Sequence, residues 1–122
     1  MHLASMNILI VDATGAVSPK AEPLFRARNW TCAHATDPRS ALSIVARELP
    51  DTIVIHNDGS KGDAAHLCQR LKANALTSGI PIIVIEDRPP PAWLLSGMPA
   101  EAVLQAPWEP EELLHHVEAL LP

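Results

Sequence analysis

The chain has 122 residues, which supports one domain with a single core and leaves too little chain for two. Its formal net charge is −5, and its nine Lys and Arg are scattered singly, so we expect no basic face and no direct nucleic-acid partner. No apolar run reaches the roughly 20 residues needed to cross a bilayer, and the start lacks the plan of a signal peptide, which predicts a cytoplasmic protein without membrane contact.

Residues 1–6 are interpreted as a tag or leader before a domain of residues 7–122. In chain order, the pattern then predicts a strand at 7–12, a helix around 19–28, a strand at 30–35, a helix at 37–48, a strand at 52–55, a helix at 63–73 and a strand at 80–85. A short or irregular helix is expected over 88–97, because three prolines open that segment. A strand at 102–104 and a helix from about 108 to 121 complete the pattern.

Short apolar strands that alternate with helices point to right-handed crossovers and parallel pairing. The sequence therefore predicts the α/β class, with a doubly wound five-stranded parallel sheet between helices, a (βα)5 three-layer sandwich of the flavodoxin and CheY-like type. The two cysteines, Cys32 and Cys68, fall in apolar segments and are read as buried free thiols.

Five segments carry a resemblance to a known family: residues 8–12, 50–55, 67–72, 80–84 and 107–113. They stand in the order and nearly at the spacing of the CheY-like receiver domain of response regulators, and the match covers residues 7–121. The resemblance implies the receiver fold and a role in bacterial two-component-type signalling. It also implies a module cut from a longer signalling protein, with an effector domain downstream.

The resemblance also identifies the positions of the family's phosphoryl chemistry. The phosphoacceptor position is His56, and imidazole cannot form the acyl phosphate that an aspartate forms. Of the two adjacent acids that hold magnesium, Asp12 is present and Ala13 replaces the other. Glu86 stands in place of a Ser or Thr, and Ala106 in place of a lysine. We expect a degenerate, phosphorylation-independent pseudo-receiver that is not an enzyme and has no cofactor, since no nucleophile and base pair appears at the strand ends.

Three carboxylates are expected around His56: Asp12, Asp58 and Glu86 form a vestigial acidic pocket. Asp12 and Glu86 should favour the protonated imidazole and raise its pKa. The alternative is a ligand or metal sensor that uses His56, Asp12 and Glu86, because imidazole and carboxylate also bind zinc-like ions.

Four apolar residues mark a possible interface: Trp93, Leu94, Leu95 and Trp108. Receiver domains commonly pair through their fourth helix, fifth strand and fifth helix, here residues 88–97, 102–104 and the last helix. The resemblance therefore predicts a homodimer or a protein partner on this surface. The alternative is that both tryptophans cap the core.

Overall fold

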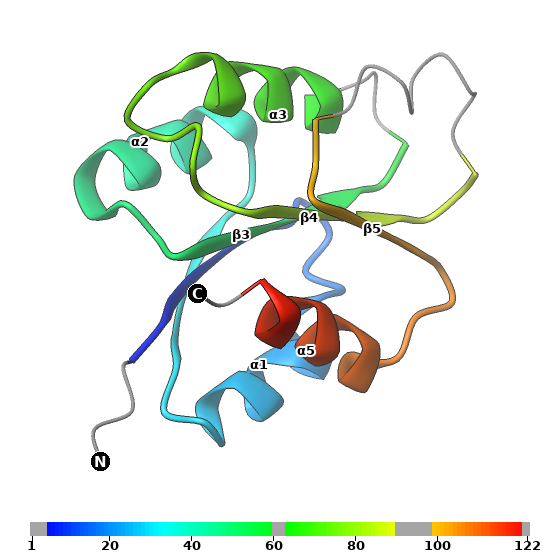
Figure 1. Ribbon diagram of the computed structural model, residues 1–122. Helices are drawn as coiled ribbons and strands as arrows, with labels where there is room; N and C mark the ends of the chain where they lie inside the picture. Colours follow the sequence, from blue (N-terminus) through cyan, green and yellow to red (C-terminus); the bar gives the residue numbers. More distant parts are fainter. Residues whose placement is uncertain (1–4, 60–62, 90–98, 121–122) are drawn as a thin grey trace.

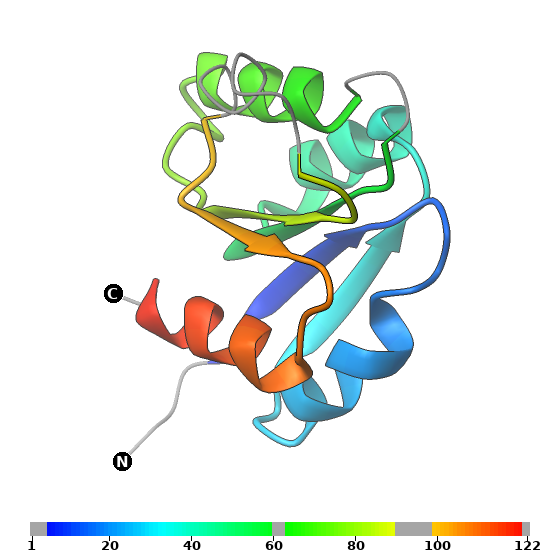
Figure 2. The ribbon, with the colours of Figure 1, turned by 90° about the vertical axis from the view of Figure 1, so that its right-hand side faces the viewer.

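The computed structural model describes residues 5–59, 63–89 and 99–120. Its strands are β1 (Asn7–Val11), β2 (Thr31–Ala35), β3 (Thr52–Asn57), β4 (Ile82–Glu86) and β5 (Ala102–Gln105), and its helices in these ranges are α1 (Ser18–Arg26), α2 (Pro38–Glu48), α3 (Asp63–Ala73) and α5 (Pro110–Ala119). The strands pair in parallel in the order β2-β1-β3-β4-β5, so β2 and β5 form the two edges (Figure 2). The predicted fold class is confirmed.

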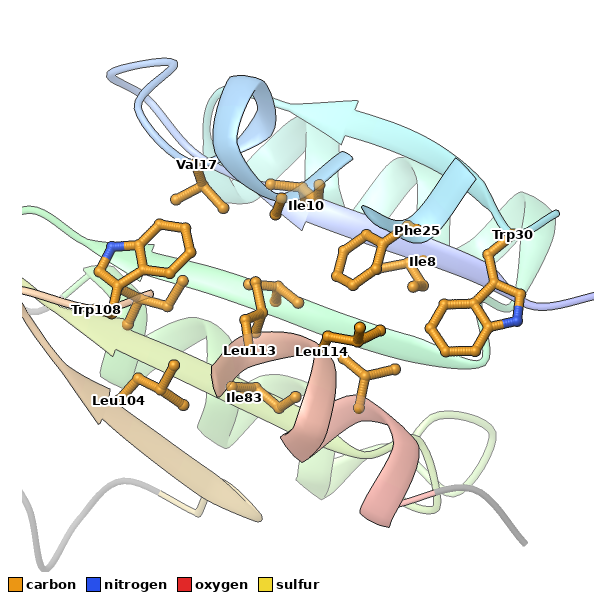
Figure 3. Packing of buried hydrophobic residues seen from close by; sticks show 14 of the residues in the cluster. Ile8, Ile10, Val17, Phe25, Trp30, Ile83, Leu104, Trp108, Leu113 and Leu114 are labelled. Atoms are coloured by element: carbon orange, nitrogen blue, oxygen red, sulfur yellow. The ribbon is translucent and has the colours of Figure 1, made fainter. Parts of the chain in front are cut away.

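The helices cover both faces of the sheet. Figure 1 shows α2 and α3 on one face and α1 and α5 on the other. Each face has its own apolar cluster, and the one beneath α1 and α5 is drawn in Figure 3. The central strands alternate their side chains between the two clusters, as Ile8 and Leu9 do on β1, which explains why these strands read as continuous apolar runs.

Several boundaries differ from the sequence-based ones. Met6, assigned to the leader, is 5% exposed in the core, and its carbonyl accepts the amide of Thr31 at 2.8 Å. Strand β4 begins at Ile82 rather than at residue 80. Helix α1 spans Ser18–Arg26 rather than about 19–28, and it continues through Pro23 with Ala21 and Phe25 buried on its inner face. These changes move ends of elements and leave their order intact.

Some expectations fall on residues outside the described ranges. They include nearly all of the helix expected over 88–97, with Trp93, Leu94 and Leu95. Among the residues that are described, no helix is long and apolar enough to cross a membrane.

Candidate functional site

Polar side chains collect where three neighbouring strands end. Asp12 follows β1, His56 lies near the end of β3, and Asp87 follows β4. Because β1, β3 and β4 are adjacent and parallel, their carboxyl ends meet at one edge of the sheet. This edge is where doubly wound folds bind ligands.

The imidazole of His56 lies between two carboxylates. Its Nδ1 is 2.8 Å from Asp12 Oδ1, and its Nε2 is 2.8 Å from Asp87 Oδ1. The side chain is only 4% exposed. Burial alone would lower the pKa of His56, but the hydrogen bonds to Asp87 and Asp12 and the negative charges of both residues outweigh it and raise the pKa. Carboxylates at both nitrogens require two N–H donors, so the arrangement is that of an imidazolium.

Asp12 is held by four hydrogen bonds from three residues. Its Oδ2 accepts the amide of Val17 at 2.8 Å, and its Oδ1 accepts the amide and the hydroxyl of Thr14 at 3.0 and 2.8 Å. Burial opposes ionisation of Asp12, but these bonds and the one from His56 prevail and lower its pKa to about 2. Three of these donors meet Oδ1 and one meets Oδ2, so Oδ1 is saturated and Oδ2 keeps one acceptor site.

Glu86 faces a different partner from the one expected. Its side chain is buried, and Asn57 Nδ2 donates to both of its oxygens, at 3.1 and 2.9 Å. Burial raises the pKa of Glu86, and the nearby Asp87 carboxylate adds to that. The predicted contact of Glu86 with His56 is therefore replaced by the hydrogen bond between His56 and Asp87. Consecutive side chains of a strand point to opposite sides, which is why only one of the two acids reaches the imidazole.

The remaining predicted positions surround this centre. Ala13 and Asp58 line a cavity of about 90 Å³ together with His56. Ala106 follows β5, and its half-buried methyl group packs against the apolar cluster beneath α1 and α5. Its amide donates to the carbonyl of Glu86 at 2.7 Å. Ala106, at the position of the family's lysine, therefore contributes a backbone hydrogen bond to the site but no positive charge.

The geometry does not favour a metal centre. In the described parts of the chain, no group of three or more His, Cys, Asp and Glu is arranged to hold a metal ion. Asp12 and Asp87 lie at opposite nitrogens of one imidazole ring, so the three side chains cannot converge on one ion.

Trp108 is wrongly predicted as an exposed interface residue. Its side chain lies in the core with Val17 and Leu113, and the residue is 7% exposed (Figure 3). Lys20 covers the ring, with Nζ 4.2 Å from the centroid, and donates to the carbonyl of Trp108 at 3.1 Å. The alternative, that this tryptophan caps the core, is the observed one. Val103 on β5 is the large apolar residue that stays exposed nearby, at 42%.

Comparisons with known proteins agree with the fold and the motif order. No protein-family model matches the chain. The chain is 30% identical over 118 residues to the response regulator MprA of Mycobacterium leprae, which covers 95% of this chain and 51% of that protein. A solved structure of a putative response regulator from Chloroflexus aurantiacus superposes with a TM-score of 0.84 at 25% identity, covering 96% of this chain and 98% of the other.

A second solved structure, the signal receiver domain of a histidine kinase from Syntrophus aciditrophicus, superposes with a TM-score of 0.86. Its identity is 22%, and the match covers 96% of this chain and 90% of the other. The chain spans about half the length of the curated relatives that it matches.

Proposed function

We propose that this chain, which is a CheY-like receiver domain, acts as a phosphorylation-independent module for protein interaction or regulation in a two-component-type signalling protein. The observation that carries the proposal is the position of His56. The side chain at the acceptor position lies between two carboxylates, one within hydrogen-bond distance of each nitrogen, and they raise its pKa and so favour the imidazolium.

An acceptor must offer a lone pair to phosphorus. An imidazolium that donates from both nitrogens has none, and an imidazole cannot form an acyl phosphate in any case. Three carboxylates stand at or beside the ring, namely Asp12, Asp87 and the buried Glu86. Their negative charge would repel the oxygens of a phosphoryl group, where catalysis requires positive charge.

The magnesium position that the family implies does not fit this chain. Ala13 supplies no ligand, and Asp12 is already engaged, since its Oδ1 accepts three hydrogen bonds from Thr14 and His56 and its Oδ2 accepts one from Val17. A hard cation needs several oxygen ligands, so a single carboxylate that already accepts hydrogen bonds from three residues is a poor site. The metal-sensor alternative is weakened by the same contacts, because Glu86 is bonded to Asn57.

We expect that small-molecule phosphodonors do not phosphorylate the protein. Incubation with acetyl phosphate and magnesium should add no mass to the intact protein, because neither a nucleophile nor a magnesium site is available. The matched control is the triple variant Ala13→Asp, His56→Asp and Ala106→Lys, in which all three side chains are restored and an adduct of one phosphoryl group is expected. A stable adduct on the wild type that disappears in His56→Ala or Asp58→Ala would overturn the proposal.

The domain is also proposed to self-associate through β5, α5 and the segment before β5. Without a phosphorylation switch, association should be constitutive and should depend only on concentration. Val103 exposes an apolar side chain on β5, and Trp93 belongs to the neighbouring segment in the sequence. Sedimentation of the wild type, Trp93→Ala and Val103→Asp should show a dimer that both substitutions weaken. A wild type that remains monomeric at several hundred micromolar excludes this interface.

A further inference from the structure

A second surface groove lies away from the proposed interface on β5 and α5. It is a groove of about 750 Å³ between α2 and α3, the two helices that lie side by side on one face of the sheet (Figure 1). Grooves of this size lie within the range of roughly 300 to 1,000 Å³ that is typical of ligand sites. Asp37, Pro38, Asp63 and Leu67 line both this groove and the cavity beside His56, so the two hollows adjoin.

The groove is built from one stripe of each helix. Arg39 and Leu42 are three residues apart on α2, and His66 and Arg70 are four apart on α3, so each pair lies on one side of its helix. Leu67 lies fully buried beneath them, and Leu42 is half-buried. The result is an apolar floor with exposed cationic side chains at its walls.

Its arginines differ from most others in the chain. Arg26, Arg28 and Arg47 each pair with a glutamate. Arg39 and Arg70 are exposed, and neither has a carboxylate within ion-pair distance in the described ranges. Asp37 and Asp63 line the same groove, and Asp37 interacts electrostatically with Arg39, but neither guanidinium is held in an ion pair within the described ranges.

Two acids at the edge of the groove are engaged with the helix starts. Asp37 caps α2, where its Oδ1 accepts the amide of Ser40 at 2.8 Å. Asp63 stands in the first turn of α3, where the helix dipole favours a negative charge. The arginines remain available for an external anion.

We propose that the groove between α2 and α3 is a docking site for an acidic segment of a partner protein. Carboxylates of the segment pair with Arg39 and Arg70, and its apolar side chains rest on Leu42. Guanidinium groups bind carboxylates through two parallel hydrogen bonds, which fixes the direction of the bound segment. This surface is separate from β5 and α5, and the proposal does not depend on whether His56 accepts phosphate.

The test uses a synthetic peptide of eight residues in which glutamate and leucine alternate, titrated into the full chain and followed by NMR. We expect saturable shifts of the amides of residues 38–42 and 66–70, and weaker binding as salt is added. Reversing both charges, with Arg39→Glu and Arg70→Glu together, should weaken binding by about tenfold or more, since two exposed ion pairs are lost. The matched control is Arg88→Glu, because Arg88 is also exposed and has no ion pair in the described ranges, yet lies outside the groove.

Four outcomes would overturn the proposal. They are the absence of saturable shifts at millimolar peptide, equal weakening by Arg88→Glu, and equal binding of a peptide in which lysine replaces glutamate. The fourth is a set of shifts along α2 and α3 that follows protein concentration without peptide, since this would make a second copy of the chain the occupant. Thermal unfolding of each variant keeps these results separate from a loss of folding.

Discussion

Replacement of His56 by alanine is expected to lower the free energy of unfolding by about 3 kcal/mol near pH 5.5, because it leaves a buried carboxylate without its cation. Of the two carboxylates that contact His56, Asp12 should contribute more to stability, since its side chain is 4% exposed against 42% for Asp87. We therefore expect Asp12→Asn to cost about 2 kcal/mol, in line with its lowered pKa, and Asp87→Asn less than about 1 kcal/mol. Urea unfolding of the three variants gives the ranking. Equal losses for the two asparagine variants would contradict it.

The stabilisation that His56 and Asp12 give each other should be lost both when the pH rises and when it falls. The pKa of His56 is raised, so its stabilisation is fully present below the unfolded value near 6.5 and is lost as pH rises through the folded value. The pKa of Asp12 is lowered, so its stabilisation is present above the unfolded value of 3.8 and is lost as pH falls through about 2. Glu86 also lowers stability as pH rises, starting from its unfolded value of 4.5, because burial raises its pKa in the folded protein.

The wild type should therefore exceed His56→Ala most clearly between about pH 4 and 6.5. The measurement is urea unfolding of both proteins across the pH range, with an NMR titration of the His56 ring in the wild type. A difference that stays constant with pH, or a His56 ring that is neutral well below pH 6, would contradict the paired imidazolium.

The sequence could predict this centre only in part. It placed Asp12, His56 and Glu86 at adjacent strand ends, because parallel strands bring their carboxyl ends to one edge. It could not tell which acid reaches the imidazole. Strand β3 continues through His56 and Asn57, paired with Ile85 and Glu86 of β4, although the apolar run ends at residue 55. This continued ladder sets Asn57 beside Glu86 and leaves Asp87 for His56.

The order of elements was predictable for a different reason. Strands buried on both faces must be apolar throughout, so β1 and β4 are visible as runs in the sequence. The burial of Trp108 could not be predicted in this way, because a single tryptophan after a strand can face either the solvent or the core. Its position depends on contacts distant in the sequence: the ring packs in the apolar cluster beneath α1 and α5, and Lys20, 88 residues away in the chain, covers it.

Replacement of Trp108 by alanine is accordingly expected to lower the free energy of unfolding by about 3 to 4 kcal/mol, through lost burial and an unfilled cavity. Lys20→Met should cost about 1 kcal/mol, since it removes the cation over the ring and the hydrogen bond to the carbonyl. Val103→Ala is the matched control on the exposed side of β5, with an expected loss below about 0.5 kcal/mol.

These three variants separate a core role of Trp108 from an interface role. A core residue changes the unfolding of the monomer and leaves the sedimentation of the folded protein as it was. An interface residue does the reverse, because its side chain is solvated in the monomer. Urea unfolding and sedimentation of Trp108→Ala should therefore show a large loss of stability with unchanged association among the folded molecules. If the variant unfolds like the wild type and only a dimer is lost, the ring does not belong to the core.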